Sequence, residues 1–163
     1  MRRGCRRIYH VPAALLVPPL LVAGLSVQAQ GDKATAAQEA TRAPIPGATD
    51  PRVTQDTIHT TICVKGYTAT VRPSVAWARA YKHHLMDKAG IPWGTRFQFE
   101  LDHAQPLETG GAPQAPDNLW LQKIAEARVK DAEETRLHRE VCAGRMSLKA
   151  AQDTIAAHWL KTK

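Results

Sequence analysis

The spacing of apolar residues predicts three helices in the second half of the chain. Residues 73–90 open with Pro-Ser and carry apolar positions among Arg, Lys and Asp up to a glycine, and a longer helical pattern covers residues 118–143. A final helix begins at Ser147, with four apolar residues on one face: Leu148, Ala151, Ile155 and Trp159. Apolar stripes that recur every three or four residues predict helices packed on a core.

Two other stretches predict extended chain. Residues 57–71 are rich in Thr, Ile, Val and Tyr around Gly66, and residues 97–101 alternate apolar and polar side chains. β-Branched residues around a turn favour short extended segments, and alternation favours a half-buried strand. Residues 108–117 have the Gly and Pro content of a loop. Together these elements predict a small α+β fold that is mostly helical.

The first 29 residues have the three parts of a secretory signal peptide. Four arginines precede an apolar stretch over residues 11–27, which leads to Ala29, and no acidic residue comes before Asp32. A basic start, an apolar middle and a small-residue exit are typical of a cleaved export signal. A retained membrane anchor is the alternative, but a spanning helix needs about 20 strongly apolar residues, and Pro18-Pro19 interrupts this stretch. We therefore expect cleavage after Ala29, no membrane anchor, and a periplasmic or secreted protein.

Composition divides the remaining chain into a linker and one domain. Residues 30–52 are rich in Ala, Thr, Pro and Gly and have too few large apolar side chains to fold alone, so they predict a flexible linker. Residues 53–163 then form one domain with a modest core. The whole chain has 22 Lys and Arg against 15 Asp and Glu, a net charge of +7, and loss of the four leader arginines leaves +3. That charge is compatible with a nucleic-acid partner but does not by itself indicate one.

Two cysteines remain after the leader, Cys63 and Cys142. In an oxidising compartment an even pair in a small domain predicts a disulfide, and two separate buried thiols are the alternative. A bridge across so long a loop would stabilise the fold by about 4–5 kcal/mol. No set of Cys and His has the spacing of a structural zinc site, which argues against a zinc-binding structural domain.

One segment carries residues suited to catalysis. Asp102-His103 ends the predicted strand, Gly110-Gly111 follows in the loop, and Asn118 stands at the start of the long helical pattern. An aspartate can hold a divalent cation through oxygen, and a histidine can activate water as a general base. Asn118 can tie the loop back to the strand through side-chain to backbone hydrogen bonds. A lone Asp-His pair is most often an ordinary surface pair, so the spacing of the whole segment must show whether this pair has a catalytic role.

That spacing resembles a known enzyme family. The run Asp-His-x-x-Pro-Leu-Glu-x-Gly-Gly over residues 102–111, followed by Asn-Leu-Trp at 118–120, is similar to the secreted bacterial branch of the His-Asn-His (HNH) endonucleases. Segments before and after this run also look like that branch, so the resemblance covers roughly residues 57–160. It implies a ββα-metal motif, with a short antiparallel β-hairpin at the centre of the domain.

The resemblance also implies a role for each motif residue. Asp102 matches the metal-binding carboxylate, His103 the general base, and Asn118 the asparagine that braces the loop and orients the histidine. The third motif residue of the family falls at Ala127, which has no ligand atom. Its neighbour Glu126 carries a carboxylate suited to a hard cation and is our candidate second ligand. One more charge on a solvated helix face is the alternative for Glu126.

The implied function is metal-dependent hydrolysis of phosphodiester bonds by an exported HNH endonuclease. The resemblance implies a divalent metal, Mg²⁺ or in its place Mn²⁺, Ni²⁺ or Zn²⁺, and a nucleic-acid partner, with DNA favoured over RNA. Arg128 and Lys130 are candidate phosphate contacts on the long helix. Because Ala127 departs from the family, the alternative is a catalytically degenerate secreted module that binds nucleic acid or has a structural role.

Overall fold

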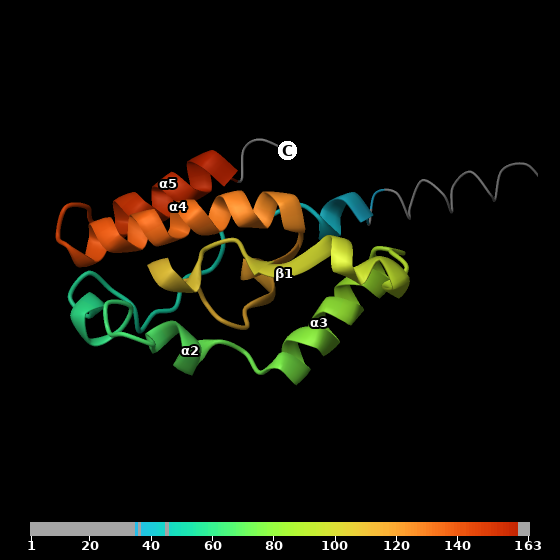
Figure 1. Ribbon diagram of the computed structural model, residues 1–163, viewed down its shortest axis with the longest axis horizontal. Coiled ribbons are helices and arrows are strands. Elements are labelled where there is room, and N and C mark those ends of the chain that lie inside the picture. The colour runs from blue at the N-terminus through green and yellow to red at the C-terminus, as the bar shows by residue number, and fades with distance from the viewer. Residues whose placement is uncertain (1–34, 36, 45, 160–163) are drawn as a thin grey trace, which may run out of the picture.

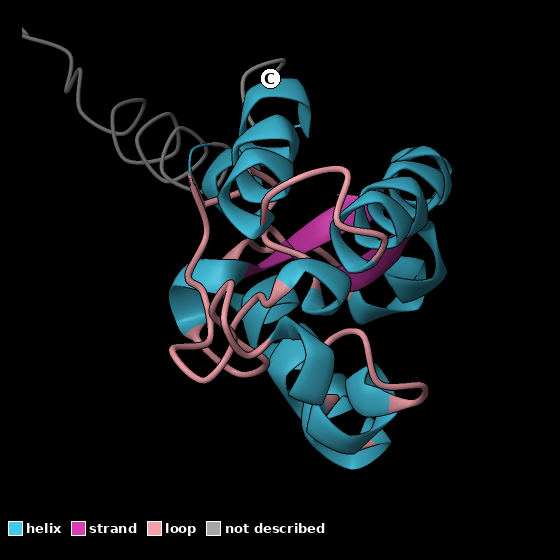
Figure 2. Ribbon diagram, turned by 90° about the vertical axis from the view of Figure 1, so that its left-hand side faces the viewer, coloured by secondary structure: helices cyan, strands magenta, loops and turns pink. Residues whose placement is uncertain are grey.

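The protein consists of helices that surround one β-hairpin (Figures 1 and 2). The computed structural model describes residues 35, 37–44 and 46–159. The predicted signal peptide, residues 1–29, lies outside the described residues. In the part of the chain that the structure describes, no helix is long and apolar enough to cross a membrane.

The elements alternate short helical turns with longer helices. In chain order they are η1 (Ile58–Thr60), α2 (Tyr67–Val71), α3 (Val75–Lys88), η2 (Trp93–Gln98), β1 (Phe99–His103), η3 (Leu107–Thr109), η4 (Pro116–Asn118), β2 (Leu119–Lys123), α4 (Ile124–Cys142) and α5 (Leu148–Trp159). The predicted α+β fold is therefore confirmed. Helix α3 begins where the sequence predicts, because the Ser74 side chain accepts a hydrogen bond from the backbone N–H of Trp77 and caps the helix.

Two predicted elements were wrong in part. Residues 57–71 form turns, η1 and α2 instead of extended segments. The long helix begins at Ile124, because residues 119–123 form strand β2. β1 and β2 pair antiparallel, with Leu101 opposite Leu121 and His103 opposite Leu119. The loop of residues 104–118 joins the two strands.

The main core lies between α4, α5 and the segment before α2. Its buried residues are Val53, Ile58, Ile62, Leu137, Val141, Leu148, Ala151 and Ile155. On α4 the buried positions 127, 130, 137 and 141 follow helical spacing, so one face of that helix points into the protein. Figures 1 and 2 show α4 and α5 side by side over the hairpin. α4 is thereby placed directly across β1.

Cys63 and Cys142 form a disulfide, as the sequence predicts. Their Cα atoms lie 5.5 Å apart, and the bridge spans 79 positions of sequence. It joins the segment before α2 to the last residue of α4. Close to the bridge, the ring nitrogen Nε2 of His138 lies 2.9 Å from the backbone oxygen of Ile62 and ties the same two segments together.

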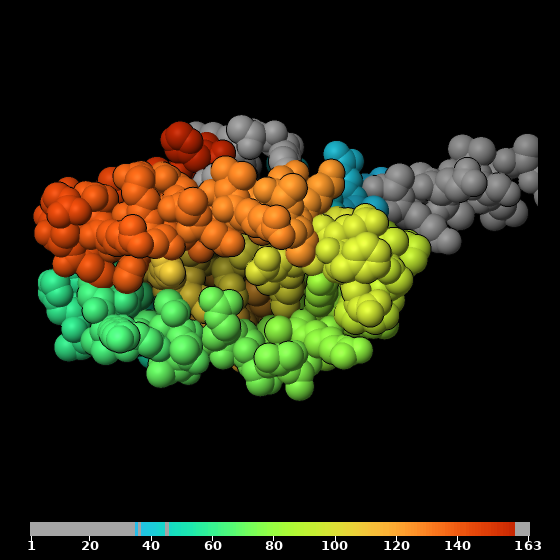
Figure 3. Space-filling model, in the orientation of Figure 1, coloured from blue at the N-terminus to red at the C-terminus, as the bar shows by residue number. Residues whose placement is uncertain are grey.

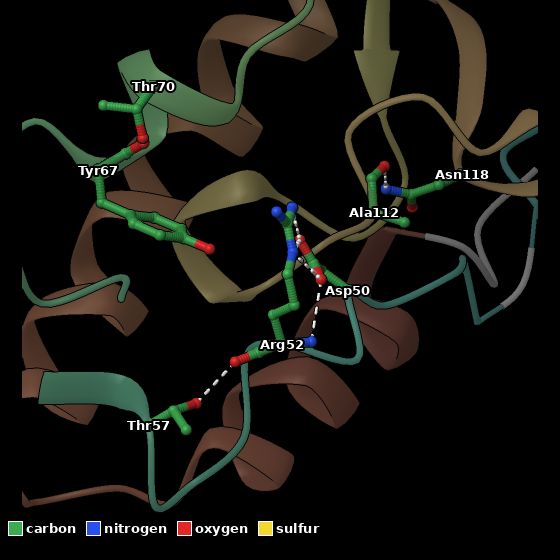
Figure 4. Close-up of polar contacts among 7 residues, drawn as sticks. All are labelled: Asp50, Arg52, Thr57, Tyr67, Thr70, Ala112 and Asn118. Carbon is green, nitrogen blue, oxygen red and sulfur yellow. Dashed lines mark hydrogen bonds and ion pairs between the residues drawn. The ribbon is translucent and has the colours of Figure 1, made fainter. Parts of the chain in front are cut away.

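The predicted linker is ordered at its C-terminal end. Backbone N–H groups of Ala48 and Asp50 donate to the carbonyls of Asp117 and Gly110, and Ala112 donates back to Ala48. Asp50 is buried and forms an ion pair of 2.6 Å with Arg52 (Figure 4). Hydrogen bonding to Arg52 holds the pKa of Asp50 below its usual value. Residues 46–52 therefore belong to the folded unit, because their backbone groups pair with the loop between the strands.

Candidate functional site

Asp102 and His103 end strand β1, where the loop of residues 104–118 begins. Successive residues on a strand point to opposite faces, so the two side chains leave the hairpin in different directions. Asp102 meets α4 through Lys130, whereas His103 lines a groove together with residues of α3 and η2. The side chains of Asp102 and His103 therefore have different neighbours, although the two residues are adjacent in sequence.

The His103 side chain has a fixed orientation. It is only 8% exposed, and Nε2 lies 2.9 Å from the backbone oxygen of Pro113. A carbonyl oxygen only accepts, so Nε2 carries the proton and Nδ1 of the neutral ring holds the free lone pair. Burial lowers the pKa of His103, against the raising effects of the Pro113 carbonyl and Asp102. The imidazole is therefore neutral near pH 7, the form that a general base requires.

Asn118 holds the loop between the strands closed. It is fully buried, and its Oδ1 accepts a hydrogen bond of 2.7 Å from the backbone N–H of Gln105. Its Nδ2 donates to the backbone oxygen of Gln105 at 3.0 Å. The same Nδ2 donates to the backbone oxygen of Ala112 at 2.9 Å (Figure 4). One side chain thereby joins the exit of β1, the middle of the loop and the entry of β2, and the position of Pro113 opposite His103 depends on this brace.

The Gly-Gly pair of the motif has a steric cause. A Cβ atom at Gly111 would lie 1.8 Å from the backbone oxygen of Gln105, so any side chain there would displace the loop. Gly110 has φ of 79°, in the left-handed region that favours glycine. Both glycines are therefore required by the path of the loop, independently of any ligand.

Lys130, a predicted phosphate contact, is completely buried, so its side chain is not on the surface that a phosphate backbone would meet. Its ammonium Nζ donates to Oδ2 of Asp102 at 2.9 Å, to the backbone oxygen of His103 at 2.7 Å, and to Oε1 of Glu134. The cause is the placement of α4 across β1, which brings position 130 onto the end of that strand. Arg128, the other predicted phosphate contact, is exposed on α4.

The cluster contains two carboxyl groups, those of Asp102 and Glu134, but only one ammonium group, that of Lys130. Burial, supported by the charge of Asp102, raises the pKa of Glu134 to about 7, although Lys130 opposes the shift. Burial alone would lower the pKa of Lys130, but the combined attraction of Asp102 and Glu134 raises it. The raised pKa keeps Lys130 in its cationic form, and its ammonium contacts both carboxylates.

Glu126 does not join Asp102 and His103. Its side chain lines a separate cavity of about 600 Å³, together with residues of the segment 35–42 and with Leu121 and Lys123. Position 127, where the resemblance places the third motif residue, is a buried alanine.

One group of three potential ligand residues has its ligand atoms within 4.8 Å of one another in the described part of the chain: Cys63, His138 and Cys142. Its two sulfur atoms are bonded to each other in the disulfide. Asp102, His103 and Glu126 are all described but do not form such a group. The expected divalent metal centre therefore does not fit this donor set, since Asp102 is already paired with an ammonium and Glu126 faces another cavity.

A groove of about 580 Å³ is lined by cationic and aromatic residues, most of which the sequence did not reveal as site residues. Four cationic residues line it: Arg72, Arg79, Lys82 and Arg96. Three aromatic residues line it as well: Trp93, Phe97 and Phe99. His103 and Glu100 complete its polar lining. The space-filling view shows this face hollowed between α4 and the α2–α3 segment (Figure 3).

The aromatic and cationic side chains of the groove are interleaved. The guanidinium carbons of Arg79 and Arg96 lie 6.0 and 5.4 Å from the ring centre of Trp93, within the range of cation–π attraction. Phe97 is 69% exposed, which is unusual for so large an apolar side chain. The sequence signal was present in the order Trp93-x-x-Arg96-Phe97-x-Phe99, but the strand pattern of residues 97–101 concealed it.

Comparison with known proteins gives no family assignment. No family model, curated protein sequence or solved structure matches the chain.

Proposed function

We propose that this is an exported protein that binds nucleic acid along the groove and hydrolyses phosphodiester bonds there, as an HNH-type endonuclease. One observation carries the proposal: His103 lines a groove with four cationic residues, with its Nε2 fixed on a backbone carbonyl. Cations supply the sequence-independent attraction to phosphates, and the free Nδ1 supplies a base. DNA remains the favoured substrate from the motif resemblance.

Residues of this chain alone can perform the proton transfer. His103 Nδ1 accepts a proton from water as the water oxygen forms a bond to phosphorus. The P–O ester bond on the opposite side breaks, and the leaving oxygen takes a proton from solvent. Asn118 acts as a positioning residue, because it fixes the loop whose Pro113 carbonyl orients the imidazole. The groove cations lie where a bound phosphate backbone needs compensating charge.

The disulfide supports export. Structural disulfides persist in the periplasm or outside the cell and are rare in the bacterial cytoplasm. Together with the basic, apolar and small-residue pattern of the first 29 residues, the Cys63–Cys142 bridge favours a periplasmic or secreted location.

A non-catalytic nucleic-acid-binding module is the second candidate. It is favoured by Ala127 and by the engagement of Asp102 with Lys130, because the family's metal site lacks a third ligand. A nicking assay on supercoiled plasmid with the oxidised protein separates the two candidates. Conversion to open-circular DNA supports the enzyme, and binding without conversion supports the module.

The groove leads to a prediction about Phe97. We expect Phe97→Ala to weaken binding of a single-stranded oligonucleotide by about 5- to 100-fold, because stacking of one base on an aromatic ring contributes about 1–3 kcal/mol. Fluorescence anisotropy with a labelled oligonucleotide at fixed salt measures the affinity. Val129→Ala is the matched control, since Val129 is a 61% exposed apolar residue on α4 that is not among the groove-lining residues. Equal losses in the two variants would contradict a role for the groove.

The pH dependence of cleavage follows from the neutral His103. Burial lowers its pKa, so the base form persists below the ordinary histidine value of about 6.5. We expect the cleavage rate to stay level from about pH 8 to 6.5 and to fall only at lower pH, as the imidazole becomes protonated. Initial rates measured across this range at constant ionic strength test the expectation. A rate that already halves near pH 7 would argue that another group is the base.

A further inference from the structure

The cluster around Lys130 has the composition of a cation site. Three oxygen atoms converge on Nζ: a carboxylate oxygen of Asp102, the backbone oxygen of His103 and a carboxylate oxygen of Glu134. They come from the end of β1 and from one turn further along α4. Carboxylate and carbonyl oxygens are the ligands that hard divalent cations bind in proteins.

The cation at this point belongs to the chain itself. Lys130 is 0% exposed, and the side chains of Asp102 and Glu134 are each 13% exposed. A buried ammonium needs such compensation, because an unpaired charge in the protein interior is strongly unfavourable. Its distances of 2.7 Å to the His103 oxygen and 2.9 Å to Asp102 are those of strong charge-assisted hydrogen bonds.

We propose that the ammonium of Lys130 takes the place of a divalent metal ion beside His103, so that the site carries its own cation. Asp102 is the residue that the motif resemblance assigns to metal, yet its Oδ2 binds Nζ. The same ammonium holds the backbone oxygen of His103 and so positions the residue that bears the base. Lys130 is thus a positioning residue that fixes the end of β1.

A smaller residue at position 130 should let this cluster bind a metal ion. Removal of the ammonium leaves two carboxylates and one carbonyl oxygen facing a vacated space, a donor set suited to Ca²⁺ or Mg²⁺. In the wild-type protein Nζ of Lys130 occupies this position. One substitution at position 130 should therefore convert this cluster from a site filled by an ammonium group into a site that binds a metal ion.

The first test measures binding of metal and not activity. In isothermal titration of the oxidised protein, Mg²⁺ and Ca²⁺ are expected to give no saturable heat, and EDTA is expected to leave the melting temperature unchanged. Stoichiometric Mg²⁺ binding that disappears in Asp102→Asn would overturn the proposal.

The second test uses substitutions of Lys130. We expect Lys130→Ala to melt at least about 10 °C lower and to recover part of this loss with increasing Ca²⁺ or Mg²⁺, since bound ligand stabilises the folded state. Lys130→Met is the matched control, because it removes the charge but refills the space, and it should not respond to either ion. An alanine variant that stays unfolded or unresponsive in saturating cation, while the methionine variant folds, would contradict the inference.

If Lys130 replaces the metal ion, cleavage should not require added metal; this expectation rests on the proposed function and is measured by the nicking rate. If the protein nicks DNA, EDTA should change the rate by less than about twofold, and abolition of cleavage by EDTA would overturn the inference for catalysis. Absence of nicking under all conditions would count against the proposed nuclease function alone, because the titration and melting tests still decide the question of the cation.

Discussion

Replacement of His103 by alanine is expected to lower the rate of plasmid nicking by about 100- to 10,000-fold, the usual contribution of a general base. The reason is that His103 lines the groove and that Nδ1 of its neutral ring carries the lone pair that can accept a proton. Affinity for DNA should change by less than about twofold, because binding depends on phosphate contacts made by the groove cations. Single-turnover nicking rates and anisotropy titrations, measured on the same preparations, separate the two effects.

His59→Ala is the matched control for this experiment. His59 is exposed in η1, so its loss removes an imidazole without touching the groove or the loop. Because His103 is nearly buried, the melting temperature of His103→Ala must be measured beside that of the wild type. Equal nicking by wild type and His103→Ala would mean that another site, or a contaminating nuclease, performs the cleavage.

The helices of the fold could be predicted because their signals are local. Helix α3 has its capping serine, and α5 has its apolar stripe, so neither depends on distant parts of the chain. Strand β2 was missed because residues 119–123 are buried on both faces, apart from the last one, and continue without a Gly or Pro into α4. Only pairing with β1 distinguishes that apolar run from the first turn of a helix.

Residues 57–71 show how tertiary packing overrides β propensity. Their Thr and Val content favours strands, yet Ile58 and Ile62 are buried in the main core and Cys63 is bonded to α4. Positions four apart share a face in a strand as well as in a helix, so the spacing of the two isoleucines does not distinguish the structures. The contacts of this segment with α4 and α5 in the main core decide its path.

Only those site residues that lie close together in the sequence could be predicted. Asp102, His103 and Asn118 stand within one loop and its flanking strands, so the sequence places them together. The partnership of Lys130 with Asp102 spans 28 positions and depends on how α4 crosses β1, which no local pattern specifies. Residues 46–52 attach through backbone hydrogen bonds, and such bonds leave no signature in composition.

The effect of the disulfide on stability should be as large as that of His103 on cleavage. We expect the double variant Cys63→Ser/Cys142→Ser to lose about 4–5 kcal/mol of unfolding free energy. The bridge closes a loop across 79 positions of sequence, and the entropy that it removes from the unfolded chain grows with loop length. For a domain of about 100 residues this corresponds to a fall in melting temperature of at least about 15 °C. Urea unfolding followed by circular dichroism measures the free-energy difference.

A reductant provides the control for the disulfide prediction, because it breaks the bridge without changing the sequence. Dithiothreitol should lower the stability of the wild type to near that of the double serine variant, and it should leave the variant itself unchanged. Non-reducing peptide mapping of the oxidised protein should recover Cys63 and Cys142 in one cross-linked fragment. A wild type whose stability is the same with and without reductant would show that the bridge does not hold the segment before α2 against the end of α4. Such a result would also remove the support that the disulfide gives to an oxidising location, since a domain that is equally stable as the dithiol has no need of that environment.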